Sequence, residues 1–127
     1  MKPICKLISA LAFAAGAMAA QALELKPYDA KALAAAQQAD KPVALHFHAD
    51  WCPTCRSQEK ALKSLASEAG LDLTVLVANY DQEKELKRHF NVRSQSTLVV
   101  LRGQQERARL VGDTSVDSIR SALKSGL

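Results

Sequence analysis

The stretch ADWCPTCRSQ, from Ala49 to Gln58, places two cysteines two residues apart and directly after a tryptophan. The apolar run VALHFHA, from Val43 to Ala49, precedes it and has the length of a buried β-strand. After the cysteines, apolar residues recur at helical spacing, at Leu62, Leu65, Ala66 and Ala69. The cysteine pair is therefore expected where a strand ends and a helix begins.

This junction would give the two cysteines different surroundings. Cys52 is expected at or just before the helix N-terminus, with Pro53 at the first helical position, where a missing N–H costs nothing. Free backbone N–H groups and the helix dipole would stabilise a thiolate at Cys52. Cys55, one turn further along, would be shielded and able to attack a mixed disulfide formed by Cys52. The pattern therefore predicts thiol–disulfide exchange.

Two other interpretations of the pair remain open. A structural disulfide across two intervening residues would close a very short loop and constrain little of the unfolded chain. A zinc site would need further ligands, and the only histidines, His46, His48 and His89, form no ligand motif with the cysteines. We therefore expect neither a bound metal nor an organic cofactor.

The first residues have the pattern of a secretory signal. Two lysines precede an apolar run at Leu7–Ala17, and an A-x-A cleavage pattern ends at Ala22. The apolar run is shorter than the ~20 residues that a transmembrane helix needs, which argues against the alternative of an uncleaved membrane anchor. We expect a cleaved leader at residues 1–22, a mature domain at residues 23–127 and a periplasmic location.

The net charge argues against one class of function, and the number of cysteines indicates what the cysteine pair is. The formal net charge of +4 falls to +2 when the leader and its two lysines are removed. That charge is too small to indicate nucleic-acid binding, so no nucleic-acid partner is expected. Cleavage would also remove Cys5, leaving Cys52 and Cys55 as the only cysteines. Two cysteines in an exported protein indicate one disulfide or one dithiol.

The rest of the chain alternates between helical and strand patterns. Hydrophobic spacing and turn residues predict these further elements: a helix at residues 31–40 capped by Asp29, strands at 71–78, 97–102 and 106–111, a short helix at 81–90, and a last helix capped by Asp113-Thr114. Alternating strands and helices indicate an α/β fold with a parallel core, to which the final hairpin adds an antiparallel edge.

The W-C-x-x-C motif at such a junction, together with the element order, resembles the thioredoxin superfamily over nearly all of residues 23–127. The segment KPVALHFHADWCPTC, residues 41–55, is similar to secreted thioredoxin-like domains, such as the C-terminal domain of the bacterial transmembrane disulfide reductase. The Cys-Pro-Thr-Cys tetrapeptide also resembles thioredoxin-like reductants of cytochrome c maturation, although the insertion usual in that group is absent. The resemblance implies a thioredoxin fold, with a central mixed β-sheet flanked by helices.

The resemblance also implies roles for residues and partners. Cys52 would be the attacking cysteine and Cys55 the resolving one, while the substrate would contact Trp51 and Pro53 and, from a loop opposite, Ser96 and Thr97. Protein thiols and disulfides would be the substrates of a monomer that acts as a reductant. A membrane redox partner would reset the cysteine pair.

The sequence departs from the family pattern at two places. Ser96 stands where the family has a cis-proline; since a cis bond before a non-proline residue costs ~2.5–4 kcal/mol, either Ser96 bears that cost or the loop is trans and differently shaped. His46 stands where the family has a buried acid, and its lysine partner corresponds to Val77. His46 is either a core residue or a proton relay for Cys55. The alternative function is a thioredoxin-fold module that binds a partner or a metal, with a structural cysteine pair.

Overall fold

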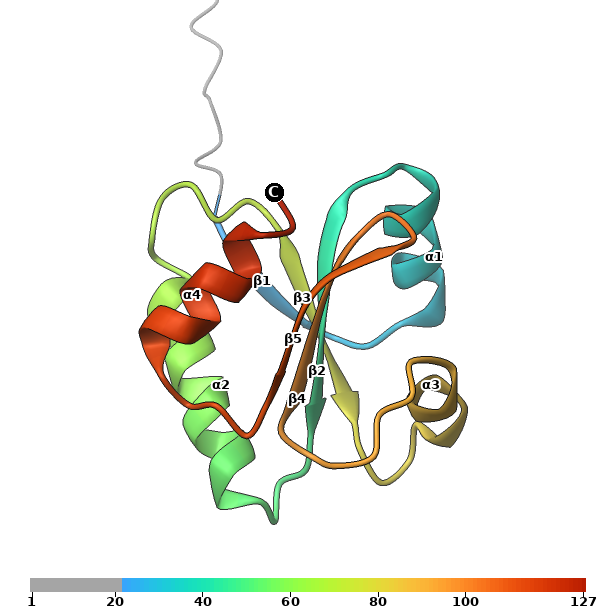
Figure 1. Ribbon diagram of the computed structural model, residues 1–127, viewed down its shortest axis with the longest axis vertical. Helices are drawn as coiled ribbons and strands as arrows, with labels where there is room; N and C mark the ends of the chain where they lie inside the picture. The colour runs from blue at the N-terminus through green and yellow to red at the C-terminus, as the bar shows by residue number, and fades with distance from the viewer. Residues whose placement is uncertain (1–21) are drawn as a thin grey trace, which may run out of the picture.

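The computed structural model describes residues 22–127, so the predicted leader lies outside the described residues except for Ala22. A five-stranded sheet in the order β1-β3-β2-β4-β5 forms the centre of the domain. Helices α2 and α4 cover one face of the sheet, and α1 and α3 cover the other (Figure 1). The elements are β1 (Glu24–Pro27), α1 (Ala30–Gln38), β2 (Pro42–His48), α2 (Pro53–Leu65), β3 (Thr74–Asn79), α3 (Lys84–His89), β4 (Thr97–Arg102), β5 (Gln105–Val111) and α4 (Val116–Lys124). The predicted α/β class and mixed sheet are confirmed.

Strand β2 lies at the centre of the sheet. It runs parallel to β3 and antiparallel to β4, so that His46 is paired with Val77 on one side and with Leu98 on the other. Successive side chains of β2 point to opposite faces. Ala44 belongs to the hydrophobic cluster under α2 and α4, whereas Leu45 and Phe47 belong to the cluster under α1 and α3. Because β2 is buried on both faces, its carboxyl end holds the cysteine junction rigidly.

One predicted helix cap is confirmed and another is wrong. Asp29 caps α1, since its carboxylate accepts a hydrogen bond from the Ala32 N–H at 3.2 Å. Ser115, rather than Asp113-Thr114, caps α4, and its hydroxyl accepts from the Ser118 N–H. The Asp113 carboxylate instead accepts from the Ser115 N–H at 2.9 Å. This turn, typical of aspartate, delays the start of the helix by one residue.

Several elements differ from the predicted ones: α3, predicted at residues 81–90, spans Lys84–His89, and α1 ends at Gln38 rather than at residue 40. Strand β1 was not predicted, because its charged Glu24 and Lys26 hide the apolar pattern and its pairing with β3 is a tertiary interaction. Strand β3 begins at Thr74, and the buried Leu71 and Leu73 lie before it, outside the ladder. Helix α2 ends at Leu65, so Ala69 lies in the turns that follow.

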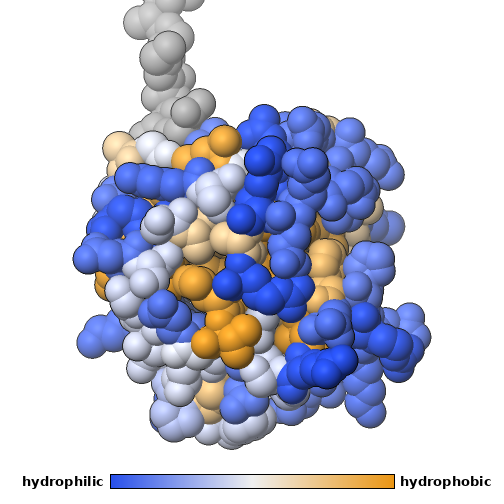
Figure 2. Space-filling view, viewed as in Figure 1, coloured by the Kyte–Doolittle hydropathy of each residue, from blue (hydrophilic) through white to orange (hydrophobic). Residues whose placement is uncertain are grey.

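The surface seen in Figure 2 is mostly hydrophilic, with hydrophobic residues in several separate patches, the larger of them near the middle of the view. Within residues 22–127, no helix is both long enough and apolar enough to cross a membrane. Large hydrophobic side chains are exposed at only a few of the described positions: Trp51, Val111, Val116 and Leu127. Trp51 is the one that adjoins the cysteine pair in sequence.

Candidate active site

Cys52 is the N-cap residue of α2, as the sequence predicts. Its backbone is extended (φ −96°, ψ 113°), Pro53 occupies the first turn, and the Cys52 sulfur accepts a hydrogen bond from the Cys55 N–H at 3.2 Å. Both cysteines are free thiols and both are buried, Cys52 at 2% and Cys55 at 0% exposure. The helix N-terminus therefore directs an otherwise unpaired backbone donor at the Cys52 sulfur.

The two thiols differ in acidity. Burial raises the pKa of Cys52, but hydrogen bonds from the Cys55 thiol, the Ser96 hydroxyl and nearby backbone N–H groups more than offset it, so the Cys52 pKa lies below its ordinary value. For Cys55, burial and the neighbouring Cys52 raise the pKa. Because the thiolate is the nucleophile, this difference fits Cys52 as the attacking sulfur and Cys55 as the sulfur that stays protonated until it is needed.

Ser96 brings its hydroxyl between the two sulfurs. Ser96 Oγ lies 3.2 Å from Cys52 Sγ and 3.0 Å from Cys55 Sγ. No cis peptide bond occurs in residues 22–127, so the loop takes the second form that the sequence allowed, with a trans bond before Ser96. The residue itself is left-handed, with φ 61°. A serine at this position therefore contacts the reacting sulfurs directly through its side chain.

Backbone hydrogen bonds hold Ser96 in this unfavourable conformation. Its N–H donates to the Phe47 carbonyl at 3.0 Å, and its carbonyl accepts from the Gly112 N–H at 2.9 Å. The neighbouring Thr97 is buried, and its hydroxyl donates to the Ser94 carbonyl at 2.8 Å. Substrate contact by Ser96, Thr97 and Pro53 stays a prediction, whereas the rigidity of the loop is a feature of the fold.

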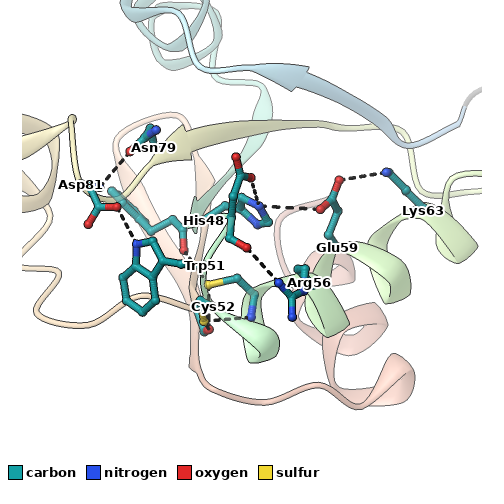
Figure 3. Close-up of polar contacts among 12 residues, drawn as sticks. His48, Trp51, Cys52, Arg56, Glu59, Lys63, Asn79 and Asp81 are labelled. Atoms are coloured by element: carbon teal, nitrogen blue, oxygen red, sulfur yellow. Dashed lines mark hydrogen bonds and ion pairs between the residues drawn. The ribbon is translucent and has the colours of Figure 1, made fainter.

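Trp51 lies on the surface beside the cysteines, with 58% of its area exposed. Its indole N–H donates to the Asp81 carboxylate at 2.7 Å, and the Asp81 N–H donates to the Asn79 side chain at 2.9 Å (Figure 3). Asp81 follows the end of β3, thirty residues after Trp51, so no local pattern in the sequence indicates this pairing. The contact fixes the orientation of an exposed aromatic ring that could meet a substrate.

A chain of polar contacts connects the motif with the surface of α2 (Figure 3). His48 Nε2 lies 3.0 Å from an Asp50 oxygen and 3.8 Å from a Glu59 oxygen. Lys63 pairs with Glu59 at 2.9 Å, and this hydrogen bond, against the opposing effect of burial, holds the Glu59 pKa below its ordinary value. Arg56 donates to the Asp50 carbonyl at 3.1 Å. These contacts order the residues immediately before Cys52.

His46 is fully buried below the site and bonds to Gln58, a residue that the sequence analysis missed. Gln58 Nε2 donates to the Ser96 and Asp113 carbonyls, at 2.9 Å each, so Gln58 Oε1 must accept the bond of 2.9 Å from His46 Nε2. Burial lowers the His46 pKa to about 4, although the bond to Gln58 opposes this shift. The described contacts include none between His46 and either cysteine, and its role as a proton relay stays a prediction.

A signal for Gln58 is present in the sequence. It lies three residues after Cys55 and four before Leu62, on the same face of α2 as the buried Leu65. A polar residue on the apolar face of a helix indicates a buried hydrogen-bond partner, because buried polar groups are rarely left unpaired.

No group of three or more His, Cys, Asp or Glu side chains within residues 22–127 could hold a metal ion.

Comparison with known proteins places this geometry in a family. The model of the family described as Thioredoxin matches residues 24–125. Thioredoxin-1 of Drosophila yakuba is 37% identical over 73 residues, which cover 58% of this chain and 68% of the relative. Thioredoxin of Mycobacterium tuberculosis is 34% identical over 88 residues, 69% of this chain and 76% of the relative. The crystal structure of Trxlp from Edwardsiella tarda superposes with a TM-score of 0.73 at 36% identity, covering 79% of this chain and 98% of that one.

Proposed function

The chain belongs to the thioredoxin family of thiol–disulfide oxidoreductases, and we propose that it is a periplasmic reductant of protein disulfides that acts through Cys52 and Cys55. The observation that carries this proposal is the asymmetry of the pair. Cys52 is the N-cap of α2 and accepts a backbone N–H at 3.2 Å, while Cys55 is fully buried one turn behind it. The substrate would meet Cys52 first, next to the exposed Trp51.

The reaction is a sequence of two exchanges. The Cys52 thiolate attacks a substrate disulfide, forms a mixed disulfide and releases one substrate thiolate. Cys55 then loses its proton and attacks the Cys52 sulfur, which releases the second substrate thiolate and leaves a Cys52–Cys55 disulfide. The raised pKa of Cys55 supports this order, because a protonated thiol does not compete with Cys52 for the substrate.

The donors around Cys52 support the reductive direction. A strongly oxidising pair has a strongly stabilised reduced form, as in DsbA at about −120 mV. The groups that lower the Cys52 pKa here are a thiol, a hydroxyl and backbone N–H groups, all of them neutral, and burial works against them. His46, the buried histidine below the site, is neutral at pH 7 because its pKa is about 4. Neutral donors stabilise a thiolate less than a cationic partner would, which favours a potential closer to that of thioredoxin, about −270 mV.

The leader pattern at residues 1–22 supports export. An exported reductant works in an oxidising compartment and is itself oxidised in each cycle. Its electrons must therefore come from the cytoplasmic side, and a membrane redox protein that exchanges thiols with Cys52 is the partner we propose. The protein would act as a monomer.

The reduction potential of the pair tests the proposal. The mature domain is equilibrated with glutathione and dithiothreitol buffers, and free thiols are trapped and counted by mass spectrometry. A potential near −270 mV supports the reductant, and one near −120 mV shows an oxidant instead. If the pair fails to equilibrate and both cysteines are alkylated equally slowly, the domain is a binding module with a structural cysteine pair.

Location is tested separately. Cells that express the full chain are fractionated, and the intact mass of the protein is measured in each fraction. A periplasmic species beginning at Leu23 supports the proposed export and cleavage. A full-length protein in the cytoplasm contradicts them.

A further inference from the structure

We propose that the Ser96 hydroxyl is a catalytic hydrogen-bond donor that serves both cysteines in turn, Cys52 in the first exchange and Cys55 in the second. This inference rests on the proposed exchange reaction. It adds the Ser96 hydroxyl to the two cysteine thiols as a third group that takes part in the reaction. The contacts that suggest it are the distances of 3.2 Å and 3.0 Å from Ser96 Oγ to the two sulfurs.

The chemistry of the three groups fixes the direction of the hydrogen bonds. A hydroxyl has one proton to donate and lone pairs with which to accept. When Cys52 is a thiolate, its sulfur can only accept, so the single Ser96 proton must point at Cys52. The one proton of the Cys55 thiol points at Cys52 as well, since its hydrogen bond lowers the Cys52 pKa. In the reduced site the Cys52 thiolate therefore accepts from both the Ser96 hydroxyl and the Cys55 thiol.

The hydroxyl is held in place by backbone contacts that do not involve the cysteines. The Ser96 N–H and carbonyl bond to Phe47, Gly112 and Gln58 over 2.9–3.0 Å. Ser96 is only 3% exposed, so bulk water does not compete for its hydroxyl. A preorganised donor in a site that excludes water stabilises charge more strongly than the same donor in water.

The other contacts of the Cys55 sulfur do not supply the side-chain donor that its thiolate needs in the second exchange. Besides Ser96 Oγ, the Cys55 sulfur contacts the Phe47 carbonyl at 3.9 Å, the Cys52 thiol, which raises the Cys55 pKa, and the backbone of Ala49, which lowers it. A carbonyl accepts hydrogen bonds and cannot stabilise a thiolate. Within residues 22–127 the structure shows no charged side chain bonded to the Cys55 sulfur. The Ser96 hydroxyl is therefore the side-chain donor available to Cys55 when its negative charge develops.

The two steps balance with the hydroxyl in this role. The Cys52 thiolate attacks a disulfide R–S–S–R′, the substrate S–S bond breaks, a Cys52–S–R bond forms and R′S⁻ leaves. Cys52 is then uncharged, so the Ser96 proton can turn to Cys55. The Cys55 proton passes to R′S⁻ to give R′SH, the Cys55 sulfur attacks Cys52 Sγ, the mixed disulfide breaks and RS⁻ leaves. Ser96 keeps its own proton throughout.

The test measures the pH dependence of Cys52 alkylation by iodoacetamide, site by site, with mass spectrometry. Ser96→Ala and Ser96→Gly both remove the hydroxyl, but glycine relaxes the left-handed backbone that alanine strains. In both variants we expect the alkylation midpoint to rise by about one pH unit, which is about a tenfold loss of thiolate at pH values below it. Ser96→Thr restores a hydroxyl and should recover most of the shift. The matched control is Ser94→Ala, in the same loop, with a wild-type midpoint expected.

A second readout isolates the second step. After a single turnover with oxidised glutathione, the mixed disulfide on Cys52 should decay about tenfold more slowly in both variants that lack the hydroxyl. Unchanged midpoints and decay in folded Ser96→Gly would overturn the proposal, as would a shift in Ser96→Ala alone, because that shift would come from backbone strain. Alkylation needs no substrate, so a protein that fails to exchange with disulfides but keeps the midpoint shift refutes the proposed function and not the hydroxyl contact.

Discussion

Gln58 accepts a hydrogen bond of 2.9 Å from the buried imidazole of His46, and its side-chain NH₂ group donates to two backbone carbonyls. One of these carbonyls belongs to Ser96, which touches both cysteines, and the other to Asp113, in the loop before α4. A single side chain of α2 therefore joins the central strand to the two loops that follow α3 and β5. His46, Gln58 and Ser96 are all buried.

We expect Gln58→Leu to lower the free energy of unfolding by roughly 2–4 kcal/mol, because it leaves the His46 N–H and the Asp113 carbonyl without a partner and the Ser96 carbonyl with the Gly112 N–H alone. Urea unfolding at pH 7, followed by circular dichroism, measures this. The control is Gln38→Leu on the exposed end of α1, for which a change below about 0.5 kcal/mol is expected. Equal stabilities of the two variants would show that the buried link contributes little.

The buried His46 should make stability depend on pH. The His46 pKa is about 4 in the folded protein and 6.5 in the unfolded chain, so between these values the unfolded chain binds a proton that the folded protein does not. The stabilisation is complete above pH 6.5 and is lost as the pH falls toward 4, by on the order of 3 kcal/mol. Urea unfolding at several pH values between 4.5 and 7 measures the slope.

His46→Gln should flatten this slope, whatever its effect on stability at pH 7. His89→Gln removes a histidine from the surface and provides the comparison, with the wild-type slope expected. A slope that survives in His46→Gln would mean that another group titrates in this range.

The resolving role that we propose for Cys55 predicts a trapped intermediate. In Cys55→Ser, attack by Cys52 on a substrate disulfide stops at the mixed disulfide, since no second thiol is present to release it. Incubation with an oxidised model protein should yield a covalent adduct, linked through Cys52 and cleaved by dithiothreitol. Cys52→Ser is the matched control and should yield no adduct, because Cys55 is fully buried.

Trp51 should matter more for protein substrates than for small ones. The exposed indole, oriented by Asp81, offers apolar contact area next to Cys52. For Trp51→Ala we expect kcat/KM with a protein disulfide to fall about tenfold, a typical loss for an aromatic contact residue, while reduction of a small aromatic disulfide changes less. Asp81→Ala should lower the fluorescence anisotropy of Trp51, the only tryptophan in the chain. Equal losses for both substrates would place Trp51 outside the protein-binding surface.

The junction of strand and helix could be predicted because its signals are local. The apolar run before Ala49, Pro53 at the start of the helix and the spacing of Leu62 and Leu65 each act within a few residues. The position of Cys52 as N-cap followed from these signals, and the structure confirms it.

The contacts that complete the site could not be predicted, because they join distant residues. Ser96 reaches Cys55 across 41 positions, and Gln58 reaches Asp113 across 55. The sequence alone allowed either isomer of the peptide bond before Ser96, which is trans. The hydrogen bonds of Ser96 to Phe47 and Gly112 join distant residues too, so the shape of this loop could not be predicted. Strand β1 was missed for the same reason, because it forms only by pairing with β3.

The two edges of the sheet are poor templates for another strand. Edge strand β1 has only four residues, carries the charged Glu24 and Lys26 and ends at Pro27, which has no N–H to offer. Edge strand β5 carries Glu106, Arg107 and Arg109, and its pairing with β4 is irregular at Val100 and Leu101. The sheet therefore offers an extended segment of another protein few backbone groups with which to pair, which lowers the tendency of the domain to aggregate through its edges.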